Sequence, residues 1–86
     1  MPVTRSAEKA LRKSLVRRQR NELRKSAIRY WRREVLRLSQ AGDMDGARRA
    51  FAMFQKAVDK AAIRGTIHPN KAARLKSRLA AKVFGG

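Results

Sequence analysis

The sequence contains no cysteine and only one histidine among its 86 residues. The lack of cysteine excludes disulfides and thiolate metal sites, and it is typical of proteins in a reducing interior. One histidine and six scattered Asp/Glu residues are too few for a catalytic triad, a carboxylate pair or a metal centre. We therefore expect no catalytic residues, no metal, no cofactor and no small-molecule substrate; the chain is not expected to be an enzyme.

Long apolar runs are also missing. No stretch approaches the roughly 18 consecutive apolar residues that a membrane span requires. The charged N-terminus is not followed by the hydrophobic segment that a signal peptide would have. These two absences predict a cytoplasmic protein with no membrane partner.

Acidic residues are scarce relative to basic ones. Twenty-three Lys/Arg residues against six Asp/Glu residues give a net charge of +17 at pH 7, and a compact chain with that charge repels itself. A merely solvated surface would mix the two signs, so this imbalance predicts a polyanionic partner. The basic residues are mostly arginine, whose planar guanidinium forks onto phosphate, and this bias favours a nucleic acid.

The few glycines and prolines divide the chain into three segments. Gly42 has the position of a residue just past a helix end, and Asp43 that of the next N-cap. Gly65 is expected to end the second helix, and Pro69 is well placed as the first residue of another helix. No alternating strand pattern is present, so the sequence predicts an all-α single domain, residues 1–86, with helices at about 6–40, 44–64 and 69–84.

The apolar positions predict how these helices pack. The second segment has a broad alanine-rich apolar face with the phenylalanines, which makes it the scaffold. In the first segment, the C-terminal part carries a stripe of Leu23, Ala27, Tyr30, Trp31, Val35 and Leu38, whereas the apolar residues nearer the N-terminus lie on a different face. We therefore expect a three-helix bundle of residues 23–86 and a basic helical arm of residues 1–22 that extends beyond it, frayed until a polyanion neutralises it.

The third segment has two faces. Lys71, Arg74, Arg78 and Lys82 lie on one side at helical spacing, and the leucines lie opposite them. Lys76 falls within the apolar side, a position that we attribute to snorkelling of its long stem.

The aromatic residues and the histidine have competing interpretations. Tyr30 and Trp31 are able to stack on bases, but their place in the apolar stripe favours packing in the core. His68 directly precedes Pro69, and this N-cap-like spacing favours a structural role over a nucleic-acid contact.

Basic residues surround the first segment on every side, as in "VRRQRNELRKSAIRYWRR". A helix on a membrane surface would show a broad apolar face opposite its cations, and a DNA-reading helix usually sits in a dimeric or helix-turn-helix frame. Cations all around suit burial among several RNA strands. A nucleoid-type DNA binder and a membrane-surface peptide remain the alternatives.

The segment AGDMDGARRAFAMFQKAVDKAAIRGTIHPNKAARLKSRLAAKV, residues 41–83, resembles the family of the twentieth protein of the bacterial small ribosomal subunit. That family's pattern is AGD, an AF pair, a late Asp and then GxIHxNKAARxKSRL. This chain has Ala41-Gly42-Asp43, Ala50-Phe51, Asp59 and, almost throughout, Gly65 to Leu79 in those places. The N-terminal part resembles the family at Arg5-Ser6-Ala7, Lys9, Arg17-Arg18, Asn21 and Lys25-Ser26.

The resemblance implies a three-helix bundle that binds small-subunit ribosomal RNA directly, early in assembly, at the 5′ domain and the long penultimate helix. Expected partners are this RNA and the ribosome, without homo-oligomerisation. The resemblance also raises His68, Asn70 and Lys71 to RNA neighbours, against the spacing argument for His68. The full set of expected rRNA-binding residues is Arg5, Ser6, Lys9, Arg12, Lys13, Arg17, Arg18, Arg20, Asn21, Arg24, Lys25, Arg29, His68, Asn70, Lys71, Arg74, Lys76, Arg78 and Lys82.

Overall fold

The structure, a computed structural model, describes the backbone of residues 5–85 and the side chains of residues 6–85. It contains three helices and, within these residues, no strand: α1 (Arg5–Gln40), α2 (Met44–Ile63) and α3 (Pro69–Phe84). The predicted all-α fold is confirmed, and the predicted helix ends differ from the observed ones by at most one residue. Residues 1–4, the first part of the expected arm, lie outside the described residues.

The turn between α1 and α2 is built by a glycine and an aspartate. Gly42 adopts φ 83°, a left-handed conformation that costs a glycine little. Its N–H bonds to Ser39 O at 3.1 Å and the Asp43 N–H bonds to Leu38 O at 2.9 Å, so the last carbonyls of α1 are satisfied. Asp43 then caps α2, because its Oδ1 accepts from the Gly46 N–H at 2.9 Å.

The turn after α2 repeats the same chemistry and sets the path into α3. Gly65 has φ 77°, its N–H bonds to Ala62 O at 3.1 Å, and the Thr66 N–H bonds to Ala61 O at 2.8 Å. Ile67 follows immediately and is buried in the core. The direction of the chain between α2 and α3 is thus fixed both by backbone hydrogen bonds and by an apolar anchor.

Replacing Gly65 with alanine is expected to lower the free energy of unfolding by about 1–2 kcal/mol, because a Cβ disfavours the left-handed backbone. No atom lies within 4 Å of the position that the Cβ would take, so the cost is conformational and not steric. Urea unfolding monitored by circular dichroism measures it. Gly65→Asn is the control, because asparagine tolerates the left-handed conformation better than alanine does. An alanine variant as stable as the parent would contradict the left-handed conformation of Gly65.

The hydrophobic core is small and has alanine at several contact positions. Phe54, Val35 and Val58 are the largest fully buried side chains, and Phe51 and Trp31 pack against them from the rim. The buried cluster comprises Ile28 and Val35 of α1, Ala50, Phe54, Val58 and Ala61 of α2, and Ile67, Ala72 and Leu79. The small alanine side chains let the helices approach closely, so that few large residues suffice to fill the space between them.

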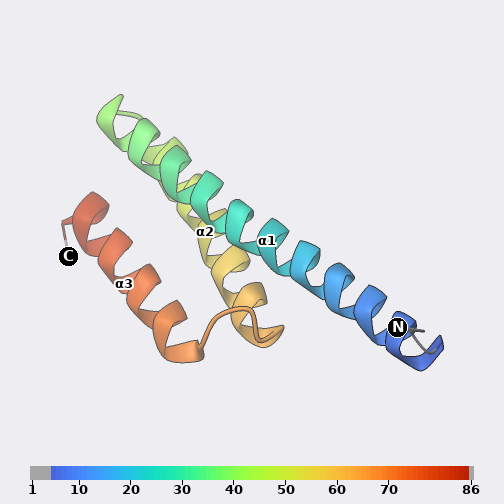
Figure 1. Cartoon of the computed structure of the whole chain (residues 1–86). Coiled ribbons are helices and arrows are strands. Elements are labelled where there is room, and N and C mark those ends of the chain that lie inside the picture. The colour runs from blue at the N-terminus through green and yellow to red at the C-terminus, as the bar shows by residue number, and fades with distance from the viewer. Residues whose placement is uncertain (1–4, 86) are drawn as a thin grey trace.

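The molecule is elongated because α1 is much longer than its partners (Figure 1). Its radius of gyration is 17.2 Å, compared with about 12 Å for a compact chain of this length. α2 runs back along the C-terminal half of α1, and α3 packs mainly on α2. The blue-to-cyan half of α1 projects past the end of α2 (Figure 1). Every described residue from Ser6 to Arg20 is exposed.

The predicted apolar stripe of α1 is partly wrong. Leu23 and Tyr30 are 69% and 53% exposed, whereas Ile28, which the stripe left out, is only 7% exposed. The centre of the packed side runs through Ile28 and Val35, one heptad apart. At about 100° per residue, Leu23 and Tyr30 lie roughly 140° and 160° around the helix from Ile28, nearly opposite it. Trp31 is half-buried against the core, as expected, with the Tyr30 ring edge-on to it at 4.9 Å.

Candidate nucleic-acid interface

The side of α1 that faces the bundle changes character along the helix. Where α2 covers it, this side presents Ile28 and Val35, both buried. Counting back from Ile28 at helical spacing gives Arg24, Arg17 and then Lys13 on the same side. One continuous helix face is therefore apolar inside the bundle and cationic where it extends beyond it.

This cationic face forms one wall of a groove, which we call the elbow groove. Its walls are Arg12, Lys13, Val16, Arg17, Arg20, Asn21 and Arg24 of α1 and, from the end of α2, Arg64 and Gly65; its volume is about 580 Å³. Six cationic side chains line it and no carboxylate does. Cations that converge on a concave surface without an acidic partner create a strongly positive potential, which attracts phosphates.

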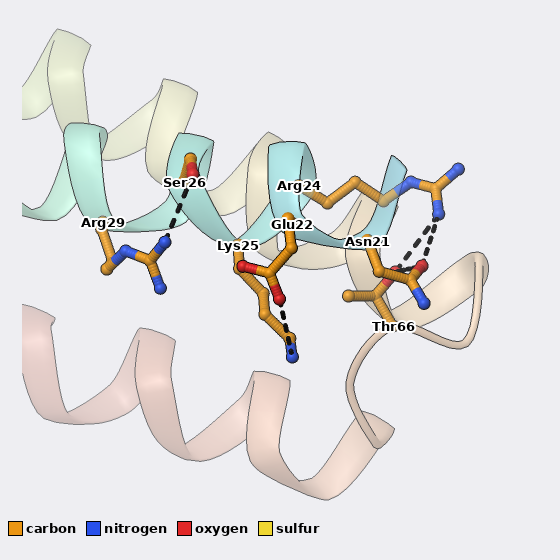
Figure 2. Close-up of polar contacts among 7 residues, drawn as sticks. All are labelled: Asn21, Glu22, Arg24, Lys25, Ser26, Arg29 and Thr66. Atoms are coloured by element: carbon orange, nitrogen blue, oxygen red, sulfur yellow. Dashed lines mark hydrogen bonds and ion pairs between the residues drawn. The ribbon is translucent and has the colours of Figure 1, made fainter. Parts of the chain in front are cut away.

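A polar cluster joins Asn21 and Arg24, which line the groove, to Thr66 of the loop after α2 (Figure 2). Arg24 Nη1 donates to Asn21 Oδ1 at 3.1 Å and to Thr66 Oγ1 at 3.3 Å. The Thr66 hydroxyl in turn donates to Asn21 Oδ1 at 2.9 Å. All three side chains are half-buried, so these hydrogen bonds tie α1 to the loop between α2 and α3.

A second, smaller concavity lies between the helices. Arg32 of α1 faces Arg78 and Lys82 of α3 across it, and Phe54, Leu75 and Leu79 also line it, around about 190 Å³. Cationic walls beside apolar side chains suit a nucleic acid, since phosphates meet the guanidinium groups while a ribose or base edge meets the apolar part.

None of the acidic side chains lines the elbow groove, and most of them are held in ion pairs or a helix cap. Within α1, Glu22 lies 3.9 Å from Lys25 Nζ, and Glu34 lies 2.8 Å from Arg37 Nη2. The hydrogen bond from Arg37 lowers the pKa of Glu34 below its ordinary value and raises the pKa of Arg37. Any stability from this pair is therefore present above the ordinary carboxyl pKa and is lost as the pH falls through the lowered one.

Lys76 has a different environment from the one we expected. It is half-buried on α3, and its Nζ lies 2.8 Å from Asp59 Oδ1 of α2. An ion pair between neighbouring helices, rather than snorkelling to solvent, therefore accounts for a lysine on the apolar side. With 52% of the Asp59 side chain exposed, the pair is screened and contributes little to stability.

His68 takes the N-cap position that its spacing predicted. Its Nδ1 accepts from the Asn70 N–H at 3.0 Å, and its backbone is extended, at φ −72° and ψ 145°. Since Nδ1 is the acceptor, the ring proton is on Nε2. The imidazole is exposed, so capping the helix leaves the Nε2–H donor available to a ligand.

The structure divides the expected rRNA-binding residues into groups. The Arg5 side chain lies outside the described residues. Arg12, Lys13, Arg17, Arg20, Asn21 and Arg24 meet in the elbow groove; Arg78 and Lys82 line the cleft between α1 and α3. Ser6, Lys9, Arg18, Lys25, Arg29, His68, Asn70, Lys71 and Arg74 are exposed and line neither concavity. Arg29 donates to Ser26 Oγ at 3.2 Å (Figure 2).

The expected set left out Arg32 and Arg64, which line these surfaces, and Thr66, which bonds to the groove residues Asn21 and Arg24. Arg64 lines the elbow groove, although it belongs to the segment that was expected to be the scaffold. Arg32 lines the cleft and belongs to the basic run of the first segment, but the expected set of residues left it out. Charge alone was their only signal in the sequence. Thr66 carries no charge, and its hydrogen bonds join residues 45 and 42 positions apart, which no local pattern reveals.

The sequence model of the family described as "Ribosomal protein S20" matches residues 2–84. The chain belongs to the ribosomal protein S20 family. It is 45% identical over 83 residues to "Small ribosomal subunit protein bS20" of Shewanella sp. (strain W3-18-1), covering 96% of this chain and 94% of that protein. The protein of the same name from Thermomicrobium roseum is 44% identical over 79 residues, which cover 92% and 80% of the two chains.

Membership of the S20 family confirms the resemblance seen in the sequence and shows that the chain is not an enzyme. Within residues 5–85, the three helices include none that is both long and apolar enough to cross a membrane. In the same residues no three His, Cys, Asp or Glu side chains gather as metal ligands would.

Proposed function

We propose that this chain is a structural constituent of the small ribosomal subunit, in the cytoplasm, and that it binds the 16S rRNA directly. The observation that carries this proposal is the elbow groove, where six cations and no carboxylate converge. The S20 family relationship supports the ribosome as the setting. The chain has no catalytic part to play in this function.

The mechanism is neutralisation of phosphates where RNA segments approach one another. The arm presents cations on every side, so it is suited to lie among several RNA strands. Counterion release from those phosphates supplies most of the affinity. Specificity comes from shape, because a rigid basic helix fits only where RNA grooves have the matching spacing.

Two surfaces suggest how one small protein stabilises RNA packing during assembly. The elbow groove lies between the arm and the end of α2, and the second cleft lies between α1 and α3. We assign one RNA segment to each surface, with the 5′ domain and the penultimate helix of the small-subunit rRNA as the two segments. Holding both lowers the repulsion that opposes their close approach.

Chemical footprinting on complete small-subunit rRNA tests the proposal, at physiological salt and with excess competitor duplex DNA. We expect discrete protected patches in the 5′ domain and the penultimate helix, because a shaped surface selects a site whereas charge alone does not. Diffuse protection that the DNA abolishes would contradict the proposal and would favour a nucleoid-type DNA binder. Anionic lipid vesicles serve as a control for the membrane-surface alternative, and we expect them not to compete.

A further inference from the structure

The polar cluster of Asn21, Arg24 and Thr66 uses its hydrogen-bonding groups in a closed arrangement (Figure 2). The two Nη1 hydrogens of Arg24 go to Asn21 Oδ1 and Thr66 Oγ1. The single Thr66 hydroxyl proton goes to Asn21 Oδ1, which thereby accepts two hydrogen bonds, the number of its lone pairs. Each member therefore constrains the other two.

Thr66 is the best-fixed member of this cluster. Its own N–H bonds to Ala61 O at 2.8 Å in the turn that ends α2, and the next residue, Ile67, is buried in the core. Asn21 and Arg24, by contrast, belong to the part of α1 where the exposed N-terminal arm joins the bundle. The threonine hydroxyl is thus a stationary point against which the Arg24 side chain is held.

The consequence for Arg24 is a restricted guanidinium orientation. With Nη1 committed to Asn21 and Thr66, the Nε–H and Nη2–H donors have no partner among the described contacts. These two donors form an edge that matches two phosphate oxygens. A free arginine loses much rotamer freedom when it binds, and a side chain that is already held loses less.

We infer that Thr66 and Asn21 are positioning residues, which hold Arg24 in the elbow groove so that its Nε–Nη2 edge meets an RNA phosphate. The inference rests on the proposed function and deepens it, since it names an uncharged side chain that sets the affinity of a cationic groove. Thr66 itself does not contact the RNA. Its effect is transmitted through Arg24.

The test is a double-mutant cycle on the full-length protein, with a transcript of the small-subunit rRNA 5′ domain as the probe. Thr66→Val removes the hydroxyl, and Thr66→Ser keeps it. Arg24→Gln removes the guanidinium group that Thr66 positions. We expect Thr66→Val to weaken binding by about 3- to 10-fold, from the loss of a hydrogen bond to a charged group and of preorganisation. Thr66→Ser is expected to bind within about twofold of the parent, because it keeps that hydrogen bond.

Two readouts separate positioning from a purely structural role. In the Arg24→Gln background, Thr66→Val is expected to change the Kd by less than about twofold, because coupled residues are not additive. The slope of log K against log salt is expected to stay unchanged in Thr66→Val. In Arg24→Gln its magnitude is expected to fall by about 0.7 to 0.9, the value for one lost phosphate contact. Urea unfolding identifies any loss of folded protein.

The possible outcomes are distinct. An equal loss of affinity from Thr66→Val in both backgrounds would show that Thr66 acts on the fold, and it would overturn the inference. Unchanged binding by Thr66→Val would overturn it as well, while leaving the proposed function intact if the parent still protects discrete rRNA patches. A parent protein without site-specific rRNA binding would overturn both.

Discussion

Replacing Phe54 with alanine is expected to lower the free energy of unfolding by about 3–5 kcal/mol. Phe54 is fully buried at the centre of a core with few other large side chains, so the cavity it leaves has little around it that can collapse inward. Natural domains of this length are stable by only about 4–13 kcal/mol. The net charge of +17 adds self-repulsion in the compact state, so the variant is expected to lose a large share of the parent's stability.

The measurement is thermal or urea unfolding by circular dichroism, with Phe51→Ala as the matched control. Phe51 lies next to Phe54, at 5.9 Å between ring centroids, and also meets Phe84 edge-on at 5.3 Å, but it is only half-buried. Its removal is therefore expected to cost clearly less. If the two variants were equally stable, burial at Phe54 would not be what holds the bundle together.

The helix boundaries were predictable because local chemistry sets them. Gly42, Asp43, Gly65 and Pro69 each act within one turn of chain, through backbone conformation or a hydrogen bond to a near neighbour. Such signals do not depend on how the helices later pack. The cap at His68 belongs to the same class, and spacing alone identified it.

The packed face of α1 was harder to predict because that helix is more polar than its partners and has an apolar residue on nearly every side. The predicted stripe included Leu23 and Tyr30 and left out Ile28, although Ile28 and Val35 are the buried α1 residues of the core. Which apolar residues a long helix buries is decided by the partner that covers it. The spacing of apolar residues within one helix does not show which side another helix will cover.

The candidate site shows the same division between local and distant information. The arm cations were expected as a set, but only the fold shows that Arg64 and Thr66 meet them after a separation of more than forty residues. Similarly, Asp59 explains the position of Lys76 from a different helix. Charge content indicated the class of partner, whereas the shape of the binding surface depends on contacts between distant segments.

Neutralising three arginines of the elbow groove is expected to weaken rRNA binding by roughly 10- to 100-fold at physiological salt, because each contributes a charge-assisted contact to phosphate. The variant carries Arg17→Gln, Arg20→Gln and Arg64→Gln, which come from both walls of the groove. The slope of log K against log salt is expected to fall by about two to three, since three fewer counterions are released from the RNA. All three side chains are exposed, so helicity is expected to remain.

A control of equal charge separates the groove from the overall polycation. Arg48→Gln, Arg49→Gln and Lys56→Gln lower the net charge by the same three units, but these residues lie on α2 and line neither the elbow groove nor the cleft. The Arg48–Asp45 pair that is lost is largely exposed and contributes little to stability. Equal weakening by the two sets would mean that net charge alone governs binding. A loss confined to the groove set would place the decisive phosphates at the elbow, where the apolar face of α1 becomes cationic.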